Sequence, residues 1–335
     1  MVSMKDISSR CQVSVATVSK ALNNRGDISD ATRERICQVA KELGYLPNSS
    51  ARALKTKRTY NIGVLFVDKA NCGLTHSYFS HVLDSFRRGA EEKGYDITFI
   101  SQHAGGNQLS YYEHSRYRGV DGVVIACVDF EDEAIQELVN GDIPVVTIDF
   151  AFDNRTSVLS DNVLGMQRIL DYIVSLGHRE IAFIHGADSL VTRNRLDSFY
   201  STLKKLGVEA KPELIREGVY HDPASSARIT EELLTLRNRP TCIIYPDDFS
   251  CVGGLNTIES KGLSVPEDIS VVGYDGQRIA QVIEPRLTTY KQNTEELGRM
   301  AARKLIEVIE QPGRTLIERL VVQGELVHGQ SVKRL

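Results

Sequence analysis

Five aspartates each stand at the end of an apolar run of the chain. They are Asp68, Asp129, Asp149, Asp247 and Asp275. Parallel α/β sheets bind their ligands at the carboxyl ends of the strands, so aspartates at these ends are expected to line one cleft. A carboxylate accepts hydrogen bonds on both oxygens, and a sugar offers many hydroxyl donors. The pattern therefore predicts a cleft rich in acceptors that suits a small, polyhydroxylated ligand.

Other side chains near these run ends could complete such a site. Arg193 and Arg195 follow the apolar run at 181–185 and could donate hydrogen bonds to ring or hydroxyl oxygens. Tyr220 could stack on the apolar face of a pyranose or on a base. An aspartate after a strand is just as often the cap of the next helix. This structural role stays open for each of the five aspartates, above all for the first two.

An acidic cleft could also belong to an enzyme. Asp247, Asp248 and Asp275 could hold Mg²⁺ or act as an acid–base pair in a hydrolase. The sequence has no HExxH, GxSxG, P-loop or GxGxxG motif, and its eight histidines show no metal-ligand spacing. We therefore expect a binding protein with no catalytic residue, no metal site and no cofactor.

Seven apolar runs supply the strands that would carry these side chains. They are 62–67, 97–100, 122–128, 144–148, 181–185, 242–245 and 269–274. The helix-like stretches between runs are 76–93, 162–176, 193–206 and 248–261. Val- and Ile-rich runs that alternate with helices imply parallel sheets covered on both faces. About 270 residues are too many for one comfortable sheet, so we expect two α/β lobes with a break near 160–162.

Residues 4–23 precede this region and are expected to form two short helices around a tight turn. Ile7 and Cys11 give the first helix an apolar edge, and Val18 and Leu22 give one to the second. From this stretch alone, a generic helical hairpin is the alternative.

Serines mark the starts of the second helix and of a third. Ser14 and Ser29 can each accept a hydrogen bond from an exposed backbone N–H of the helix that follows. The third helix is expected at 30–43, because its apolar positions repeat at i, i+3, i+4 and i+7 from Ile36. Three short helices of this kind, with one polar face, predict a DNA-binding head of the helix-turn-helix type.

The outer face of the second helix is small, hydroxylated or cationic. It consists of Val15, Ala16, Thr17, Ser19, Lys20 and Asn23. Small side chains let a helix approach the DNA major groove, hydroxyls and Lys meet phosphates, and methyl groups meet thymine. Since Val15 lies three residues before Val18, it could instead face the core, whereas Ala16 is expected on the outside.

Charge is distributed unevenly along the chain. Residues 1–60 hold eleven Lys and Arg against five Asp and Glu, whereas the remainder holds 29 against 39. A small basic head on an acidic body indicates a polyanionic partner at one end only. The short basic segment 48–59 could be a flexible linker, which its composition favours.

The compartment is expected to be the cytosol. The six cysteines show no CxxC spacing, and they are interpreted as reduced core cysteines. The polar start MVSMKD fits no signal peptide, and no apolar run approaches the ~20 residues of a membrane span, so no membrane partner is expected. A sugar-binding protein for transport would need an export signal and would have no use for a basic head.

Three sequence segments carry a specific resemblance. VSVATVSKALN, ISDATRERI and AKELGYLPNSSARAL resemble the N-terminal region of the LacI/GalR family of ligand-responsive transcription regulators. The resemblance continues to about residue 328 and implies a periplasmic-binding-protein-like core of type I. It implies a head at 1–46, a hinge helix at 47–60 and a core at 61–335, with lobe 1 at about 61–160 plus 292–320 and lobe 2 at about 162–289 plus 322–330.

The resemblance also assigns residues to DNA. Ser14, Thr17, Lys20 and Asn23 match positions that hold phosphates. Val15 and Ala16 match the pair that reads bases, and this pair resembles the galactose-repressor branch. In the hinge, Ala51, Arg52 and Leu54 are implied in the minor groove, with Leu54 as a wedge in a base step. Asn48 and Lys55 complete the expected DNA-binding set, and Lys57 and Arg58 would add phosphate attraction.

At the cleft, the resemblance implies a set of effector-binding residues. These are Tyr78, Phe79, Asp149, Arg195, Tyr220, Asp247, Asp275 and Gln292. The chain departs from the family pattern in two places. Asp247-Asp248 stands where many sugar-responsive members have Asn-Asp, and the loop 69–75 is longer than usual, which leaves the register of 69–79 open.

The expected function is that of a sequence-specific transcription regulator. We expect a cytoplasmic homodimer that represses a carbohydrate-utilisation operon and leaves its operator when a small, galactoside-like sugar binds. The alternative is a co-repressor-dependent regulator that responds to a nucleobase or a sugar phosphate. The chain ends soon after an expected last strand at 326–330 with no heptad tail, which favours a dimer over a tetramer.

Overall fold

A computed structural model describes residues 2–23, 28–46, 53, 57–67 and 73–335. The chain divides into two compact units, residues 1–59 and residues 60–335. Each unit is considered by itself. The predicted hinge residues Asn48, Ala51, Arg52, Leu54 and Lys55 lie outside the described residues, as do Asp68 and most of the loop 69–75.

The N-terminal unit contains the three predicted helices, α1 (Met4–Cys11), α2 (Val15–Leu22) and α3 (Asp30–Glu42). The Ser14 hydroxyl caps α2 by accepting a hydrogen bond from the Thr17 N–H, and Ser29 caps α3 in the same way from Thr32. One buried side chain from each helix, Ile7, Val18 and Ile36, forms the centre of a small core.

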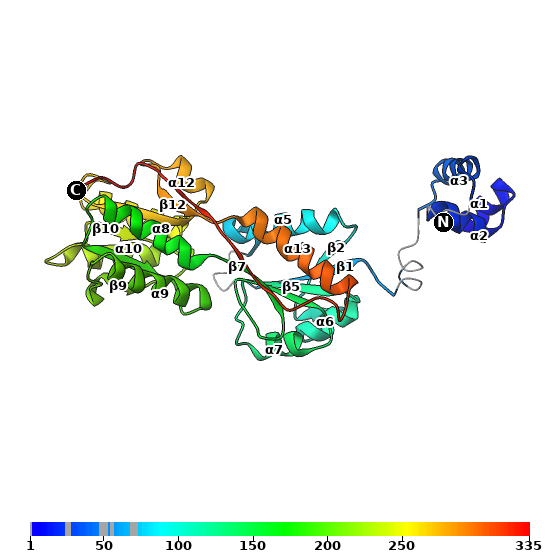
Figure 1. Cartoon of the computed structure of the whole chain (residues 1–335), viewed down its shortest axis with the longest axis horizontal. Helices are drawn as coiled ribbons and strands as arrows, with labels where there is room; N and C mark the ends of the chain where they lie inside the picture. The colour runs from blue at the N-terminus through cyan, green and yellow to red at the C-terminus, as the bar shows by residue number, and fades with distance from the viewer. Residues whose placement is uncertain (1, 24–27, 47–52, 54–56, 68–72) are drawn as a thin grey trace. The chain divides into compact units, whose positions relative to one another are not determined.

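The C-terminal unit contains two six-stranded sheets, each the centre of one lobe (Figure 1). In lobe 1 the strand order is β13 (Arg319–Val322), β7 (Thr156–Ser160), β6 (Val145–Ile148), β5 (Gly122–Ala126), β1 (Asn61–Phe66), β2 (Asp96–Phe99). In lobe 2 it is β14 (Glu325–Val327), β12 (Thr288–Lys291), β11 (Ser270–Asp275), β10 (Cys242–Ile244), β8 (Ile181–His185), β9 (Ile215–Glu217). The pairing of β12 with β14 is antiparallel, and the other pairs in both sheets are parallel.

Helices cover both faces of each sheet. Lobe 1 has α5 (Ser77–Glu91) and α13 (Thr294–Glu310) on one face, and α6 (Tyr111–Arg118) and α7 (Glu133–Asn140) on the other. Lobe 2 has α8 (Asn162–Ser175) and α9 (Leu190–Lys205) opposite α10 (Pro223–Thr235) and α11 (Asp248–Ser260), with α12 (Arg278–Val282) beside α11. Neighbouring residues such as Val64 and Leu65 enter different cores, which explains why the strands are continuously apolar.

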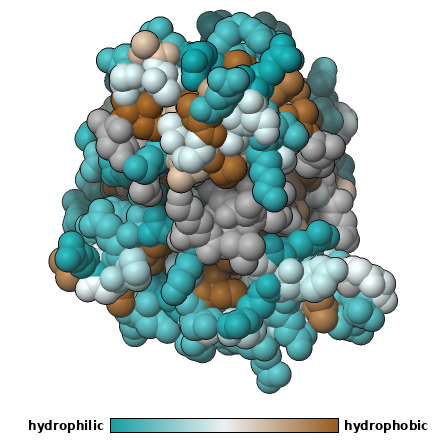
Figure 2. Space-filling view, turned by 90° about the vertical axis from the view of Figure 1, so that its right-hand side faces the viewer, coloured by the Kyte–Doolittle hydropathy of each residue, from teal (hydrophilic) through white to brown (hydrophobic). Residues whose placement is uncertain are grey.

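Shorter elements complete the core unit. They are the hairpin β3 (His103–Ala104) with β4 (Asn107–Gln108) and the 3₁₀ turns Gly73–Thr75 and Pro212–Leu214. Figure 2 shows one face of the molecule, whose coloured surface is mostly hydrophilic with scattered apolar residues. Among the described helices, none combines the length and apolar composition that crossing a bilayer requires.

The chain crosses between the lobes three times. The first crossing, at 160–162, is the predicted break between β7 and α8. The second leads from β12 to α13 at 291–294, and the third leads from β13 to β14 at 322–325 (Figure 1). Gly324 is required at the third crossing, because a Cβ there would lie 2.2 Å from the Lys291 carbonyl oxygen.

Two sequence predictions need correction. The last strand is β14, Glu325–Val327, rather than 326–330, because the chain beyond it bonds to loop atoms, including the Arg286 carbonyl that accepts from the Gln330 N–H. The cysteine prediction is wrong for Cys37, which is exposed on α3, although all five described cysteines are free thiols.

A buried histidine makes the fold sensitive to pH. The His178 ring nitrogens lie 2.9 Å from the Thr241 hydroxyl and 3.0 Å from the Lys333 carbonyl oxygen. Burial lowers the pKa of His178 below its usual value of 6.5. The unfolded chain therefore binds this proton first as the pH falls, so the contribution of His178 to stability is lost below about pH 6.5.

We predict that, between pH 7.5 and 5.5, the free energy of unfolding of the wild type falls relative to that of His178→Gln, by about 1.4 kcal/mol for each unit of depression of the His178 pKa. Urea unfolding at several pH values measures this trend. The comparison with His178→Gln cancels the contributions of the other titrating groups, which both proteins share. An equal slope in the variant and the wild type would contradict the assignment to His178.

Candidate functional site

The outer face of α2 is presented to solvent. Val15 is 40% exposed, so it does not face the core, and Ala16 and Lys20 are exposed beside it. The hydroxyl groups of Ser14 and Thr17 form a hydrogen bond at the start of the helix, with 2.8 Å between their oxygens. At the other end, the Asn23 amide donates to the Ser19 carbonyl at 2.6 Å. The backbone is thereby fixed while the small side chains between these ends remain accessible.

In the core, a buried tyrosine lies where lobe 1 meets the second crossing. The Tyr78 hydroxyl on α5 donates to Asp149 Oδ2 at 2.9 Å and lies 3.5 Å from Gln292 Oε1. The Ser160 hydroxyl, at the first crossing, is 3.2 Å away. The second Asp149 oxygen accepts from the Ser160 N–H at 2.8 Å. Asp149 is therefore bound to the end of the neighbouring strand as well as to α5.

Gln292 continues this chain of contacts into lobe 2. Its amide nitrogen donates to Asp275 Oδ1 at 2.6 Å. Arg195 on α9 approaches the same oxygen at 4.0 Å and donates to Asn162 Oδ1 and to the Pro246 carbonyl, each at 2.8 Å. A continuous polar network thus runs from Asp149 in lobe 1, through the crossing strand, to Arg195 in lobe 2.

Burial dominates the electrostatics of this network. It raises the pKa of Asp275 to about 7, although the Arg195 guanidinium acts in the opposite direction. Burial also raises the pKa of Asp149, against the hydrogen bonds from Ser160 and Tyr78. The pKa of Tyr78 lies well above its usual value because the hydroxyl is buried, so it remains a donor.

Backbone geometry at the strand ends sets the direction of the two network carboxylates. Asp149 has φ of 59° and Asp275 has φ of 96°, a region that residues with a Cβ rarely adopt. Each such conformation costs about 1–3 kcal/mol and persists only where surrounding contacts impose it. The strained backbone turns both side chains back from their strands toward the interlobe network.

Tyr220 and Asp247 lie on the lobe 2 side of the site. The Tyr220 hydroxyl is 2.9 Å from the Thr192 hydroxyl, and the Arg195 guanidinium carbon is 5.7 Å from the ring centre. Asp247 caps α11 by accepting from the Ser250 N–H at 2.7 Å, and it also accepts from the His221 N–H at 2.8 Å. Asp247 therefore has the helix-capping role that was the alternative for each aspartate.

Aromatic rings bridge the lobes beside the polar network. Phe79 packs against Phe66 and His76 in lobe 1, with centroid distances of 5.6 and 5.1 Å. The His76 ring stacks on His221 of lobe 2 at 4.3 Å, and His221 stacks on Phe249 at 4.4 Å. Sequence reasoning missed this stack, because His76 and His221 come from separate loops, Phe249 lies at the start of α11, and no spacing in the chain links them.

Two side chains considered from the sequence lie away from the network. Arg193 is exposed and pairs with Asp188 at 2.6 Å, so the prediction that it lines the site is wrong. The Asp129 carboxylate accepts from the Glu131 N–H at 3.1 Å in an exposed loop, which is a structural role. Arg193 lies outside the network because its side chain points to solvent. Asp129 lies outside it because β5 ends at Ala126 and Asp129 follows in an exposed loop.

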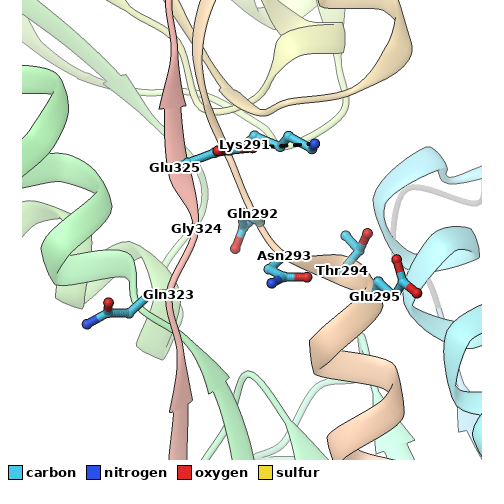
Figure 3. Close-up of a pocket in the computed structure, with 8 residues that line it drawn as sticks. All are labelled: Lys291, Gln292, Asn293, Thr294, Glu295, Gln323, Gly324 and Glu325. Atoms are coloured by element: carbon cyan, nitrogen blue, oxygen red, sulfur yellow. Dashed lines mark ion pairs between the residues drawn. The ribbon is translucent and has the colours of Figure 1, made fainter.

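A crevice separates the second and third crossings (Figure 3). It has a volume of about 410 Å³ and is lined by residues 291–295 and 323–325. Lys291 and Glu325 form an ion pair across it at 3.5 Å. Gln292 is shared between this crevice and the polar network, so its position links the site to the crossing strands.

Comparisons with known proteins identify the family. Residues 3–48 match the model for bacterial regulatory proteins of the lacI family, and residues 170–332 match a periplasmic binding protein-like domain. The chain is 32% identical to the "Probable HTH-type transcriptional repressor ExuR" of Bacillus subtilis (strain 168), over 100% of this chain and 99% of the relative. The chain belongs to the LacI family. It is a DNA-binding transcriptional repressor of that family, and its relatives are transcription regulators rather than enzymes.

Two further comparisons agree with this LacI-family assignment. The ribose operon repressor of Haemophilus influenzae is 30% identical over 95% of this chain and 96% of its own length. The lac repressor dimer bound to operator and the anti-inducer ONPF matches with a TM-score of 0.83 and 26% identity, over 99% of each chain. The predicted fold, a helix-turn-helix head with a two-lobed parallel α/β core, is therefore confirmed.

We predict that Tyr78→Phe lowers the free energy of unfolding by about 1–3 kcal/mol, because the Asp149 carboxylate loses the hydrogen bond from the buried Tyr78 hydroxyl. Chemical denaturation of the full-length protein measures the loss. Tyr117→Phe is the matched control, since Tyr117 is 64% exposed and its change should stay within about 0.5 kcal/mol. Equal effects in the two variants would show that the Tyr78 hydroxyl does not stabilise the fold.

Proposed function

We propose that this LacI-family repressor controls a carbohydrate-utilisation operon and is released from its operator by a small, uncharged sugar. The observation that supports this most directly is the composition of the interlobe site. Asp149, Asp247 and Asp275 provide acceptors for hydroxyl groups, and Arg195 is the one guanidinium in contact with the described network. A ligand with many hydroxyl donors and no negative charge suits this balance.

The excess of carboxylates over guanidinium groups in this site disfavours anionic effectors. A phosphate or a carboxylate placed beside Asp149, Asp247 and Asp275, which have little solvent exposure, would meet like charges in a site of low dielectric. A sugar phosphate is therefore a poorer candidate than the free sugar. A nucleobase acting as co-repressor remains the alternative, and the stack of His76, His221 and Phe249 is the observation that favours it, because a planar ring fits beside such rings.

The operator would be read by a homodimer through two heads. Val15 and Ala16 are proposed to contact bases, and Ser14, Thr17, Ser19, Lys20 and Asn23 to contact phosphates. In the hinge, Asn48, Ala51, Arg52, Leu54 and Lys55 are proposed to bind the minor groove and its phosphates, with Leu54 as the wedge. Two heads on one pseudo-palindromic site gain effective concentration over a single head.

Release would follow from coupling between the lobes and the hinge. Sugar binding between the lobes changes contacts that include Gln292 on the second crossing, and a change of lobe orientation alters the spacing of paired hinge segments. A coupling free energy of about 1–3 kcal/mol would change operator affinity roughly 5- to 150-fold, and operator DNA would weaken sugar binding by the same factor.

We predict that Ala16→Asp lowers the affinity for a palindromic operator duplex at least about tenfold, because a carboxylate on the reading face meets the DNA phosphates. Fluorescence anisotropy at constant moderate salt compares the operator with a scrambled duplex. Ser9→Asp on α1 is the control, since Ser9 is exposed on a different helix. If both substitutions weaken binding equally, the outer face of α2 does not read the operator.

We predict that a neutral sugar raises the melting temperature of the protein in a thermal-shift screen, whereas the matching uronate and sugar phosphate do not. The affinity for the responding sugar should rise between pH 6 and pH 7.5. The reason is that hydroxyl donors bind the ionised Asp275 carboxylate, whose pKa in the free protein is about 7, so binding below that pH must first release its proton.

Titration calorimetry measures this proton release, which should be about half a proton per sugar at pH 7, rise toward about one proton well below pH 7 and be absent in Asp275→Asn. The decrease in affinity should approach tenfold for each pH unit below 7. A response to purines alone, or to anionic sugars alone, would refute the proposed effector class. It would leave the assignment as a LacI-family repressor unchanged.

A further inference from the structure

Asp248 is a buried carboxylate that lies one residue beyond the helix cap Asp247. It is the first residue of α11, and its side chain is 0% exposed. Burying a carboxylate is costly unless hydrogen bonds compensate for the lost water. The donors that compensate Asp248 do not come from its own helix, and their positions indicate what the residue does.

Both donors belong to the segments that flank Asp275. Asp248 Oδ2 accepts from the Gln277 backbone N–H at 2.6 Å. Asp248 Oδ1 accepts from the Thr289 hydroxyl of β12 at 2.7 Å. The same Thr289 oxygen accepts from the Gly276 N–H at 3.2 Å. The two backbone N–H groups that follow Asp275 are therefore held by Asp248, one directly and one through Thr289.

The segment fixed by these hydrogen bonds, residues 275–277, is called the Asp275 turn, and its backbone is strained. Asp275 has φ of 96° and Gly276 has φ of 68°, so two consecutive residues lie in the left-handed region. This backbone directs the Asp275 side chain toward Gln292 and Arg195. A non-glycine residue pays for such a conformation with about 1–3 kcal/mol, so fixed hydrogen bonds on the next two amides are needed to keep it populated.

The sheet also makes room for the Asp248 carboxylate. Gly273 lies on β11 opposite Thr289, and a Cβ at Gly273 would lie 2.1 Å from Asp248 Oδ1. Gly273, Thr289 and the Asp275 turn thus surround one carboxylate from three sides. The arrangement distinguishes two adjacent aspartates, since Asp247 binds the loop at His221 and Asp248 binds the loop at Gln277.

We propose that Asp248 is a positioning residue, which fixes the Asp275 turn so that the Asp275 carboxylate points into the effector site. Asp248 itself does not touch the effector. The inference concerns the effector site of the proposed function and rests on that proposal for its functional meaning. The hydrogen bonds that carry it can be tested without any ligand.

The first experiment measures amide hydrogen exchange of full-length protein without effector. Asp248→Asn keeps the shape of the side chain but presents one acceptor oxygen in place of two. We expect the Gly276 and Gln277 amides to exchange at least about tenfold faster than in the wild type, which corresponds to ~1.4 kcal/mol. Asp132→Asn, which alters the cap of α7 in lobe 1, is the control and should leave these amides unchanged. Wild-type exchange rates in Asp248→Asn would overturn the proposal.

A second pair of variants keeps the test valid if Asp248→Asn fails to fold. Thr289→Val removes the hydroxyl between Asp248 and Gly276, and Thr289→Ser retains it. We expect faster exchange at Gly276 in Thr289→Val and a wild-type rate in Thr289→Ser. Equal rates in both variants would contradict the role of the hydroxyl in holding the turn.

The functional readout is a double-mutant cycle on sugar affinity. Asp248→Asn and Asp275→Asn should each weaken binding at least about tenfold, and the double variant should be no weaker than Asp275→Asn alone, because Asp248 acts through Asp275. Additive losses would indicate a separate structural role and refute the positioning role. Absence of any sugar response in the wild type would refute the proposed effector instead, and the exchange rates would then decide the role of Asp248.

Discussion

The arrangement of the two lobes depends on hydrogen bonds to carboxylates that lie between them and have little contact with water. Asp149 and Asp275 stand at strand ends in different sheets, and neither has a partner within its own strand. Their side-chain donors are the Tyr78 hydroxyl on α5 and the Gln292 amide on a crossing strand, and Asp149 also accepts from the Ser160 N–H. Because an unpaired buried charge is costly, this network favours the lobe arrangement in which these groups meet. A hydroxyl-bearing effector would compete for the same acceptors, which is how binding could alter that arrangement.

The parallel sheets explain why such groups meet at all. In each lobe the strands end at one edge, and the side chains that follow them share that edge. The three crossings bring the two edges together, and Gln292 lies on a crossing rather than in either lobe. Its contacts with Tyr78 and Asp275 therefore join the site to the strands that connect the lobes.

The N-terminal unit follows a different physical rule. Three short helices have few apolar residues to bury, so their ends are stabilised by caps at Ser3, Ser14 and Ser29. The small residues on the outer face of α2 contribute little to that core, and Val15 is exposed although it lies three residues before the buried Val18. One face of α2 is thereby left exposed to solvent.

Much of this could be predicted from the sequence, because the relevant signals are local. Continuous apolar runs gave the positions of seven strands, serines before apolar stripes gave the caps of α2 and α3, and charge separated the head from the core. The resemblance placed the effector-site candidates along the chain. The strands β7, β9, β12 and β13 were not predicted, because they are short and mix polar with apolar residues.

Only the tertiary structure decided which hydrogen-bond partners each aspartate has. Asp247 and Asp248 are adjacent and chemically identical, yet one faces the loop at His221 and the other faces the Asp275 turn. Tyr78 meets Asp149, 71 residues away, and the stacking of His76 on His221 joins two lobes. Periodicity along a chain encodes how deeply a residue is buried, but the identity of its partner depends on contacts that form only when distant segments close on one another.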